Sequence, residues 1–137
     1  DLGIKKTLQK FGHYSSKAHQ TVRSLATAIK KQLPNSKVIA VHNNKGYSIK
    51  YYLRDNLLKA DALKINFVDK NNYRNFFLVT RTDDFLRQKK LGVNVVLQAQ
   101  SATDDGSLSI YRSNHPYINV EAAYDALAGQ IKMLKQA

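Results

Sequence analysis

Few side chains in this sequence could do acid–base or metal chemistry. There are four histidines, nine aspartates and a single glutamate, Glu121, and there is no cysteine. Without thiolates, a metal site would have to use histidine and carboxylate ligands. His13 and His19 are six residues apart and point to different sides of a helix, whereas a helical metal-binding pair needs a spacing of one turn. We therefore expect no metal site and no cofactor.

Two pairs of adjacent aspartates are better explained by local structure than by catalysis. Asp83 and Asp84 would lie in the first turn of a helix, where carboxylates complement the helix dipole. Asp104 and Asp105 precede a glycine and are typical of a turn. No serine has the glycine-flanked setting of a catalytic nucleophile, and no glycine-rich phosphate loop is present. These observations favour a protein that is not an enzyme.

His42 is the histidine whose setting suggests a catalytic hypothesis. It ends an apolar strand, a predicted hairpin follows, and Asn56 falls in the next predicted helix. Over residues 42–61 this order is similar to that of the ββα-metal nucleases. The resemblance implies that His42 activates water, that Asn56 holds Mg²⁺ and that Asp61 completes the site. An ordinary hairpin leading into a helix explains the same residues, so a small metal-dependent nuclease is our third hypothesis.

Cations and tyrosines are interleaved between residues 45 and 54. This stretch holds Lys45, Lys50, Arg54 and three tyrosines. Aromatic rings can stack on nucleobases while lysine and arginine neutralise phosphates. The alternation also predicts a half-buried strand, with Tyr52 on the exposed face beside the cations and the other two tyrosines in the core. Either way, the cations and Tyr52 are expected to be exposed.

The net charge is the strongest signal in the sequence. The 137 residues include 22 Lys and Arg against 10 acids, a net charge of +12. Residues 1–37 carry eight basic side chains and one acid, residues 38–92 carry eleven and five, and residues 93–137 carry three and four. A field of this size attracts polyanions. The residues expected to contact the polyanion are Lys6, Lys10, Lys17, Lys45, Lys50, Tyr52, Arg54, Arg74, Lys89 and Lys90.

The elements that must position these residues begin with a long N-terminal helix. Hydrophobic residues recur at helical spacing from Ile4 to Ile29, and lysines fall on the opposite side. Gly12 and Ser15 also allow two helices, the second capped by a serine, and a single bent helix fits equally well. Its apolar side is expected to pack on the core, and Pro34 ends the helix.

The remainder of the sequence predicts three hairpins, two short helices and a C-terminal helix. The hairpins pair residues 38–41 with 47–53, 65–68 with 73–80, and 93–100 with 107–112. Short helices are expected at 56–63 and from Thr82 to Lys90, with Gly92 just beyond the second. The last helix is expected after Asn119, which would cap it. The fold class is therefore α+β, a mostly antiparallel sheet of hairpins with the helices packed on it. Residues 1–137 are expected to form a single domain, and its origin as a part of a longer chain is left open.

Our leading hypothesis is a non-enzymatic interaction domain that binds a polyanion, with nucleic acid as the first candidate. The alternative is an exported or cell-surface domain that binds a protein partner, or an anionic cell-wall or membrane component, within a larger assembly. We infer no small-molecule substrate. No apolar run approaches the roughly 18 residues that span a bilayer, so an integral membrane protein is not expected. Both a cytoplasmic and an exported location remain open.

Overall fold

A five-stranded mixed sheet forms the centre of the structure, a computed structural model that describes residues 2–137. Its strands are β1 (Val38–Asn44), β2 (Ala62–Asn66), β3 (Phe76–Val79), β4 (Val95–Gln98) and β5 (Tyr117–Ala123). Their order across the sheet is β1-β5-β3-β4-β2. The pairs β1–β5 and β3–β4 are parallel, and β3–β5 and β2–β4 are antiparallel. The α+β class is confirmed, but the expected antiparallel character is not.

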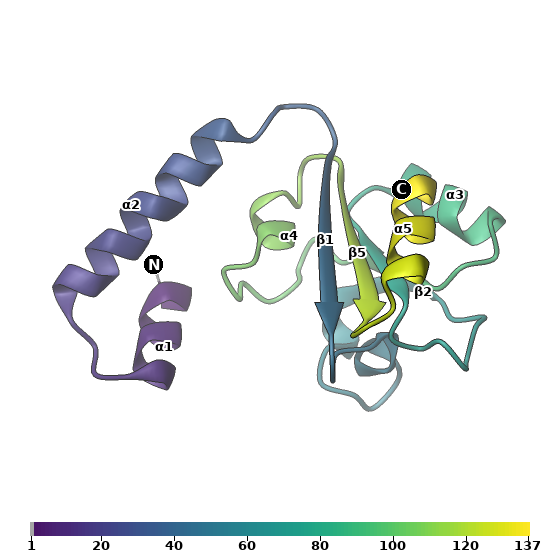
Figure 1. The fold of residues 1–137 in the computed structure, drawn as a ribbon, viewed down its shortest axis with the longest axis horizontal. Coiled ribbons are helices and arrows are strands. Elements are labelled where there is room, and N and C mark those ends of the chain that lie inside the picture. The colour runs from purple at the N-terminus through teal and green to yellow at the C-terminus, as the bar shows by residue number, and fades with distance from the viewer. Residues whose placement is uncertain (1) are drawn as a thin grey trace.

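Helices cover both faces of this sheet (Figure 1). The helices are α1 (Leu2–Phe11), α2 (Ser16–Gln32), α3 (Thr82–Lys90), α4 (Leu108–Tyr111) and α5 (Leu127–Gln136), with two 3₁₀ turns, η1 (Ile49–Tyr52) and η2 (Lys59–Asp61). On one face, α3 lies against β3 and β4 and α5 lies against β5 and β1. On the other face, η1 lies against β4 and α4 lies against β5. No helix within residues 2–137 is long and apolar enough to cross a bilayer.

Each face of the sheet has its own hydrophobic cluster, because side chains alternate along every strand. The larger cluster lies under α3 and α5 and consists of Phe77, Val79, Phe85, Val95, Leu97, Ile118, Val120 and Met133. The cluster on the opposite face lies under η1 and consists of Ile49, Tyr52, Ala62, Phe76, Leu78 and Val96. This second cluster covers only part of its face, which leaves room for a cavity beside it.

The N-terminal segment forms two helices instead of one long helix. The first helix ends at Phe11. The Ser15 hydroxyl accepts a hydrogen bond from the Ala18 N–H at 3.1 Å, and this bond caps α2. The two helices project to one side of the sheet (Figure 1). None of the residues of α2 is buried, so its apolar side does not enter the core, contrary to expectation. Leu25 in its centre is 60% exposed.

Four further expected elements are wrong. The short helix expected at 56–63 does not form, because residues 59–61 form the turn η2 and β2 begins at Ala62. The other three together explain the change in topology. Residues 49–52 form the turn η1 and residues 108–111 form the helix α4, where strands were expected. Residues 117–123 form the strand β5, where we expected the cap and start of a helix. Because β5 takes the place between β1 and β3, and β4 lies between β3 and β2, none of the three expected hairpins exists. The strands near 38–41 and 93–100 and the helix from Thr82 to Lys90 are confirmed.

Candidate functional site

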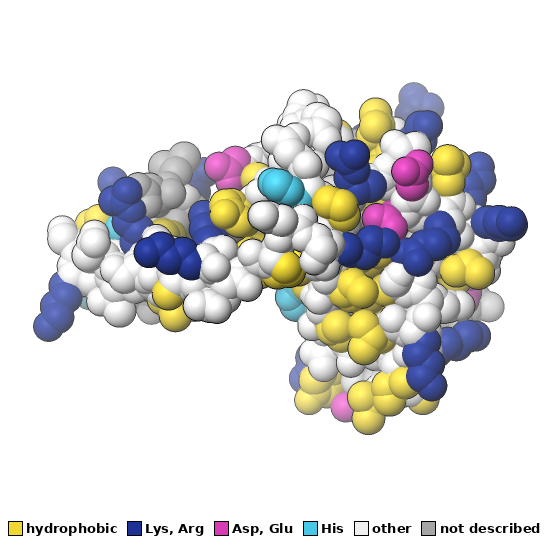
Figure 2. All heavy atoms as spheres, turned by 90° about the horizontal axis from the view of Figure 1, so that it is seen from above, with side chains coloured by type: hydrophobic (Ala, Val, Ile, Leu, Met, Phe, Trp, Pro, Cys, Tyr) yellow, Lys and Arg dark blue, Asp and Glu magenta, His cyan; other side chains and the backbone are white. Residues whose placement is uncertain are grey.

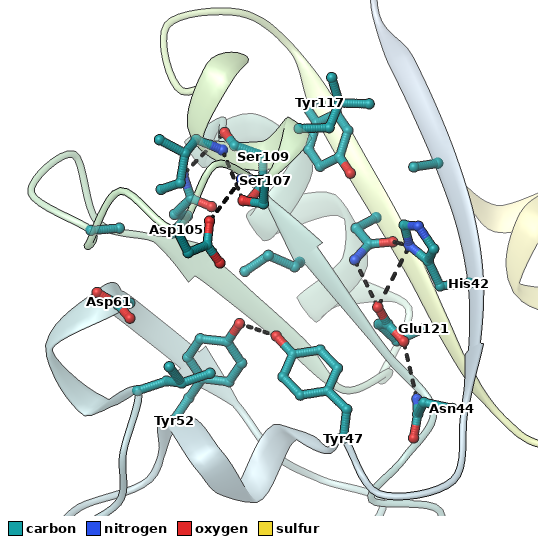
Figure 3. A pocket seen from close by; sticks show the side chains of 18 of the residues that line it. His42, Asn44, Tyr47, Tyr52, Asp61, Asp105, Ser107, Ser109, Tyr117 and Glu121 are labelled. Atoms are coloured by element: carbon teal, nitrogen blue, oxygen red, sulfur yellow. Dashed lines mark hydrogen bonds and ion pairs between the residues drawn. The ribbon is translucent and has the colours of Figure 1, made fainter. Parts of the chain in front are cut away.

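A large cavity lies on the sheet face opposite α3 and α5. It has a volume of about 630 Å³ and is lined by β1, β5, η1 and the loop that leads into α4 (Figure 3). Cavities of this size are typical of small-molecule sites. Its walls come from segments far apart in sequence, so only the folded chain creates it.

Strand β5 supplies the floor of the cavity through its side-chain alternation. Tyr117, Asn119 and Glu121 face the cavity, while Ile118 and Val120 enter the hydrophobic core on the other side. All five residues are at least nine-tenths buried. The strand is therefore apolar on one side and polar on the other, although both sides are covered by protein.

Glu121 is a buried carboxylate held by neutral amides. Its side chain is 5% exposed. The Asn44 amide donates to Oε2 at 3.0 Å, and the Asn119 amide donates to Oε1 at 2.9 Å. His42 Nδ1 lies 3.6 Å from Oε1. Hydrogen bonds to a carboxylate offset part of the cost of burying it, and a protonated His42 would add an opposite charge.

Asn119 also fixes the tautomer of His42. The Nδ1 atom of His42 lies 2.7 Å from the Asn119 side-chain oxygen. A carbonyl oxygen can only accept, so Nδ1 carries a hydrogen. Asn119 thus links the His42 imidazole to the Glu121 carboxylate, and these hydrogen bonds orient the ring. The His42 side chain is 55% exposed, so the ring is accessible to solvent.

Three tyrosines bring their hydroxyls to the same cavity. The hydroxyls of Tyr47 and Tyr52 hydrogen-bond to each other. Burial raises the pKa of Tyr47, and raises that of Tyr52 to about 12. Burial, together with the Glu121 carboxylate, also raises the pKa of Tyr117 to about 12. All three phenols are therefore protonated at neutral pH and act as hydrogen-bond donors or acceptors.

The wall across the cavity from Glu121 carries two more carboxylates (Figure 3). Asp61 accepts the backbone N–H of Thr103 at 2.7 Å, and Asp105 accepts that of Ser107 at 2.8 Å. Asp105 is thus fixed within its own loop, whereas Asp61 is fixed by a residue 42 positions along the chain. No lysine or arginine is among the cavity-lining residues in the described part of the chain. The cavity of this strongly basic protein is acidic.

The residues of the nuclease hypothesis are not brought together. His42 and Asp61 line opposite sides of the cavity (Figure 3). Asn56 lies outside it, in an exposed turn where its amide donates to the Arg54 carbonyl. Within residues 2–137, no three His, Asp or Glu side chains are grouped as metal ligands. The ββα-metal arrangement also needs a hairpin and a helix after His42, and the chain forms the turns η1 and η2 there.

The ten predicted polyanion-binding residues lie in three separate regions. Lys6, Lys10 and Lys17 lie on the projecting helices, and Lys89 and Lys90 end α3, on the face of the sheet opposite η1. The others lie on or near η1 and the adjacent loop. On the face that Figure 2 shows, Lys and Arg side chains are scattered over both the projecting helices and the sheet unit.

The third region unites two stretches that are distant in sequence. The Ile49 N–H donates to the Tyr73 carbonyl at 3.1 Å, which joins η1 to the loop before β3. Lys50 Nζ lies 3.8 Å from the centre of the Tyr73 ring, and the Arg74 guanidinium lies 5.5 Å from it. At the same end of the sheet, Lys45 Nζ lies 4.3 Å from the Tyr124 ring. We call Lys45, Lys50, Tyr73, Arg74 and Tyr124 the basic–aromatic cluster.

Tyr52 is the one predicted contact residue that the structure corrects. It is 4% exposed and packs edge-on against Phe76, because η1 turns its ring into the core. The cavity residues Asn44, Asn119 and Glu121 were missed as a site. The available signal was the uniqueness of Glu121 in a chain with nine aspartates, and it did not indicate which residues lie beside it.

Comparison of the chain with models of protein families, with curated protein sequences and with solved structures found no match to any of them.

Proposed function

We propose that this chain binds a polyanion through the basic–aromatic cluster, with nucleic acid as the first candidate. The observation that carries the proposal is the position of Lys45 and Lys50, whose ammonium groups lie 4.3 Å and 3.8 Å from the rings of Tyr124 and Tyr73. Tyrosine rings next to cations offer a stacking surface and phosphate neutralisation together. The net charge of +12 would bring a polyanion to this surface.

The cluster favours a single strand over a duplex. Bases can stack on protein rings only when they are unstacked from one another, as in single-stranded segments. The acidic cavity cannot take phosphate, because Glu121, Asp61 and Asp105 would repel it. The phosphates would therefore contact the outer surface of the protein, where the cluster lies.

The experiment measures fluorescence anisotropy with a labelled single-stranded oligonucleotide over a range of salt concentrations. The test variant is Lys45→Glu/Lys50→Glu, and the matched control is Lys89→Glu/Lys90→Glu, which changes the charge equally on the opposite face. Each phosphate contact to a single strand contributes about 0.7 to the slope of log K against log salt. We expect the test variant to lose affinity strongly and to have a slope smaller by about 1.4.

Two outcomes would contradict the proposal. Equal losses in the two variants would mean that the overall charge acts without a defined surface. Equal affinity of the wild-type protein for inorganic polyphosphate of the same charge would remove nucleic acid as the preferred ligand. Circular dichroism of each variant checks that the fold is intact.

A protein partner is a second candidate, favoured by the exposed apolar side of α2. Leu25 and Ile29 are exposed one turn apart on a helix that buries no residue. A photo-crosslinker placed at position 25 in the native host should form a defined adduct, whereas one at Gln20, on another side of the helix, should not. The same adduct from both positions, or none from either, would contradict this candidate.

A further inference from the structure

We propose that the acidic cavity is a binding site for an aliphatic diamine or polyamine. This site is separate from the basic–aromatic cluster and does not depend on nucleic-acid binding. The proposal combines three features: carboxylates on two opposite walls, tyrosine side chains between them, and the hydroxyl of Tyr117, which has no protein partner.

The carboxylates give the cavity its charge. Glu121 lies on one wall, and Asp61 and Asp105 lie on the other (Figure 3). Their hydrogen bonds come from amides and backbone N–H groups, which carry no net charge. His42 is the one basic side chain that lines the cavity within the described residues. Glu121 is buried, whereas Asp61 is partly exposed and Asp105 is exposed. A buried charge is normally balanced by an opposite charge, so the Glu121 side of the cavity favours a cationic group, and the two aspartates add to the attraction.

The pKa of Tyr52 reflects the negative potential of these carboxylates. Burial is the main reason that the pKa of Tyr52 is raised to about 12, and the Asp61, Glu121 and Asp105 carboxylates raise it further. A phenol whose ionisation is opposed by all three carboxylates lies within their combined field. This field attracts an ammonium group and repels phosphates and carboxylates.

Tyr117 supplies the independent indication of a ligand. Its side chain is only 2% exposed and lines the cavity, and Figure 3 shows its hydroxyl directed toward the interior. The hydroxyl makes no hydrogen bond to any residue of the described chain. This oxygen is therefore available to accept an N–H from a molecule bound in the cavity.

The position of the carboxylates on opposite walls favours an extended molecule with two or more ammonium groups (Figure 3). One ammonium would lie at Glu121, with the Tyr117 hydroxyl as a second acceptor, and another would lie at Asp61 and Asp105. Aromatic rings attract cations and also pack against methylene groups, so Tyr47 and Tyr52 suit the chain between the two charges. A monoamine would leave one acidic wall without a counter-ion.

Isothermal titration calorimetry of putrescine and of spermidine into the whole protein tests this proposal, at physiological salt and without nucleic acid. We expect a single site. The uncharged 1,4-butanediol has the same carbon chain as putrescine and should bind far more weakly. Glu121→Gln should weaken putrescine binding by about tenfold or more, a tenfold change being about 1.4 kcal/mol. Asp61→Asn should weaken it as well.

Matched variants separate the cavity from the remaining surface. Tyr117→Phe removes a hydroxyl that makes no protein hydrogen bond, so it should keep the fold and weaken putrescine binding severalfold. Asp83→Asn removes an exposed carboxylate on α3, on the opposite face, and should leave binding unchanged.

Three results would overturn the proposal. These are no binding of either amine at millimolar concentration, binding of the diol as tight as that of putrescine, or a loss of putrescine affinity in Asp83→Asn equal to that in Glu121→Gln. Because no polyanion is present, none of them would bear on nucleic-acid binding.

Discussion

The two faces of the sheet differ although the same strands build both. Under α3 and α5, strands β3, β4 and β5 contribute apolar side chains, which include Phe77, Ile118 and Val120. On the opposite face, β5 presents Asn119 and Glu121 to a cavity of about 630 Å³. Both faces are covered, so burial alone would favour apolar residues at every one of these positions. The difference indicates that the second face keeps polar side chains at a cost to stability.

This cost is reduced by hydrogen bonding rather than by ion pairs to lysine or arginine. Asn119 accepts from His42 and donates to Glu121, and Asn44 donates to the other carboxylate oxygen. Burial costs less free energy for polar groups that hydrogen-bond to one another than for polar groups without partners. One face therefore stabilises the fold, while the other presents oriented polar groups to a cavity. The predictions below test this division by measuring the free energy of unfolding.

The largest effect is expected for Phe77→Ala on the apolar face. Phe77 is fully buried between the sheet and its helices, so its truncation removes apolar contacts and leaves a void. Such substitutions cost about 3–5 kcal/mol. Urea denaturation measures the change, with Leu86→Ala as the control because Leu86 is exposed on α3. Similar losses in both variants would mean that the core does not lie where we describe it.

Asn119→Ala, on the polar face, should lower the free energy of unfolding by a smaller amount. The substitution removes the partner of His42 Nδ1 and one donor to the Glu121 carboxylate. Leaving buried polar groups without partners costs about 1–3 kcal/mol. The exposed Asn114→Ala is the matched control. A stabilised Asn119→Ala protein would show that the hydrogen-bonded chain is not formed.

The third prediction concerns alkaline pH, where Tyr117 distinguishes the two faces. Its folded pKa is about 12, against about 10 when unfolded, so folding favours the protonated phenol. The stabilisation is full below pH 10 and is lost as the pH rises toward 12, by about 1.4 kcal/mol per pH unit in that interval. Urea denaturation at pH 9 and pH 11 should show that the free energy of unfolding falls more steeply with rising pH in the wild-type protein than in Tyr117→Phe. Identical losses would contradict burial of the phenol.

The sequence predicted those elements whose signals are local. The helix from Thr82 to Lys90 follows from acids in its first turn and bases in its last, and both lie there in the structure. The strand that begins at Val38 follows from a short apolar run. The Ser15 cap was one of two alternatives and depends on one nearby N–H. Signals of this kind need no knowledge of tertiary contacts.

The site could not be predicted, because its pattern was misinterpreted and its contacts are long-range. Residues from Val120 onward recur at helical spacing, which favoured a helix. In the structure, β5 pairs with strands on both sides, and this tertiary pairing overrides the local pattern. His42 was identified as a candidate, but the asparagine that orients it lies 77 residues away. Only the parallel pairing of β1 with β5 brings them side by side.

Glu121 is the only glutamate in the chain, and it lies in the cavity. This coincidence makes one atom of the site separately observable. A protein labelled with carbon-13 at the glutamate carboxyl carbon would give a single side-chain resonance in a nuclear magnetic resonance spectrum, without interference from the nine aspartates. The chemical shift of that resonance follows the protonation of the carboxylate and the approach of any ligand. One isotope label therefore turns the buried carboxylate into a direct reporter of what enters the cavity.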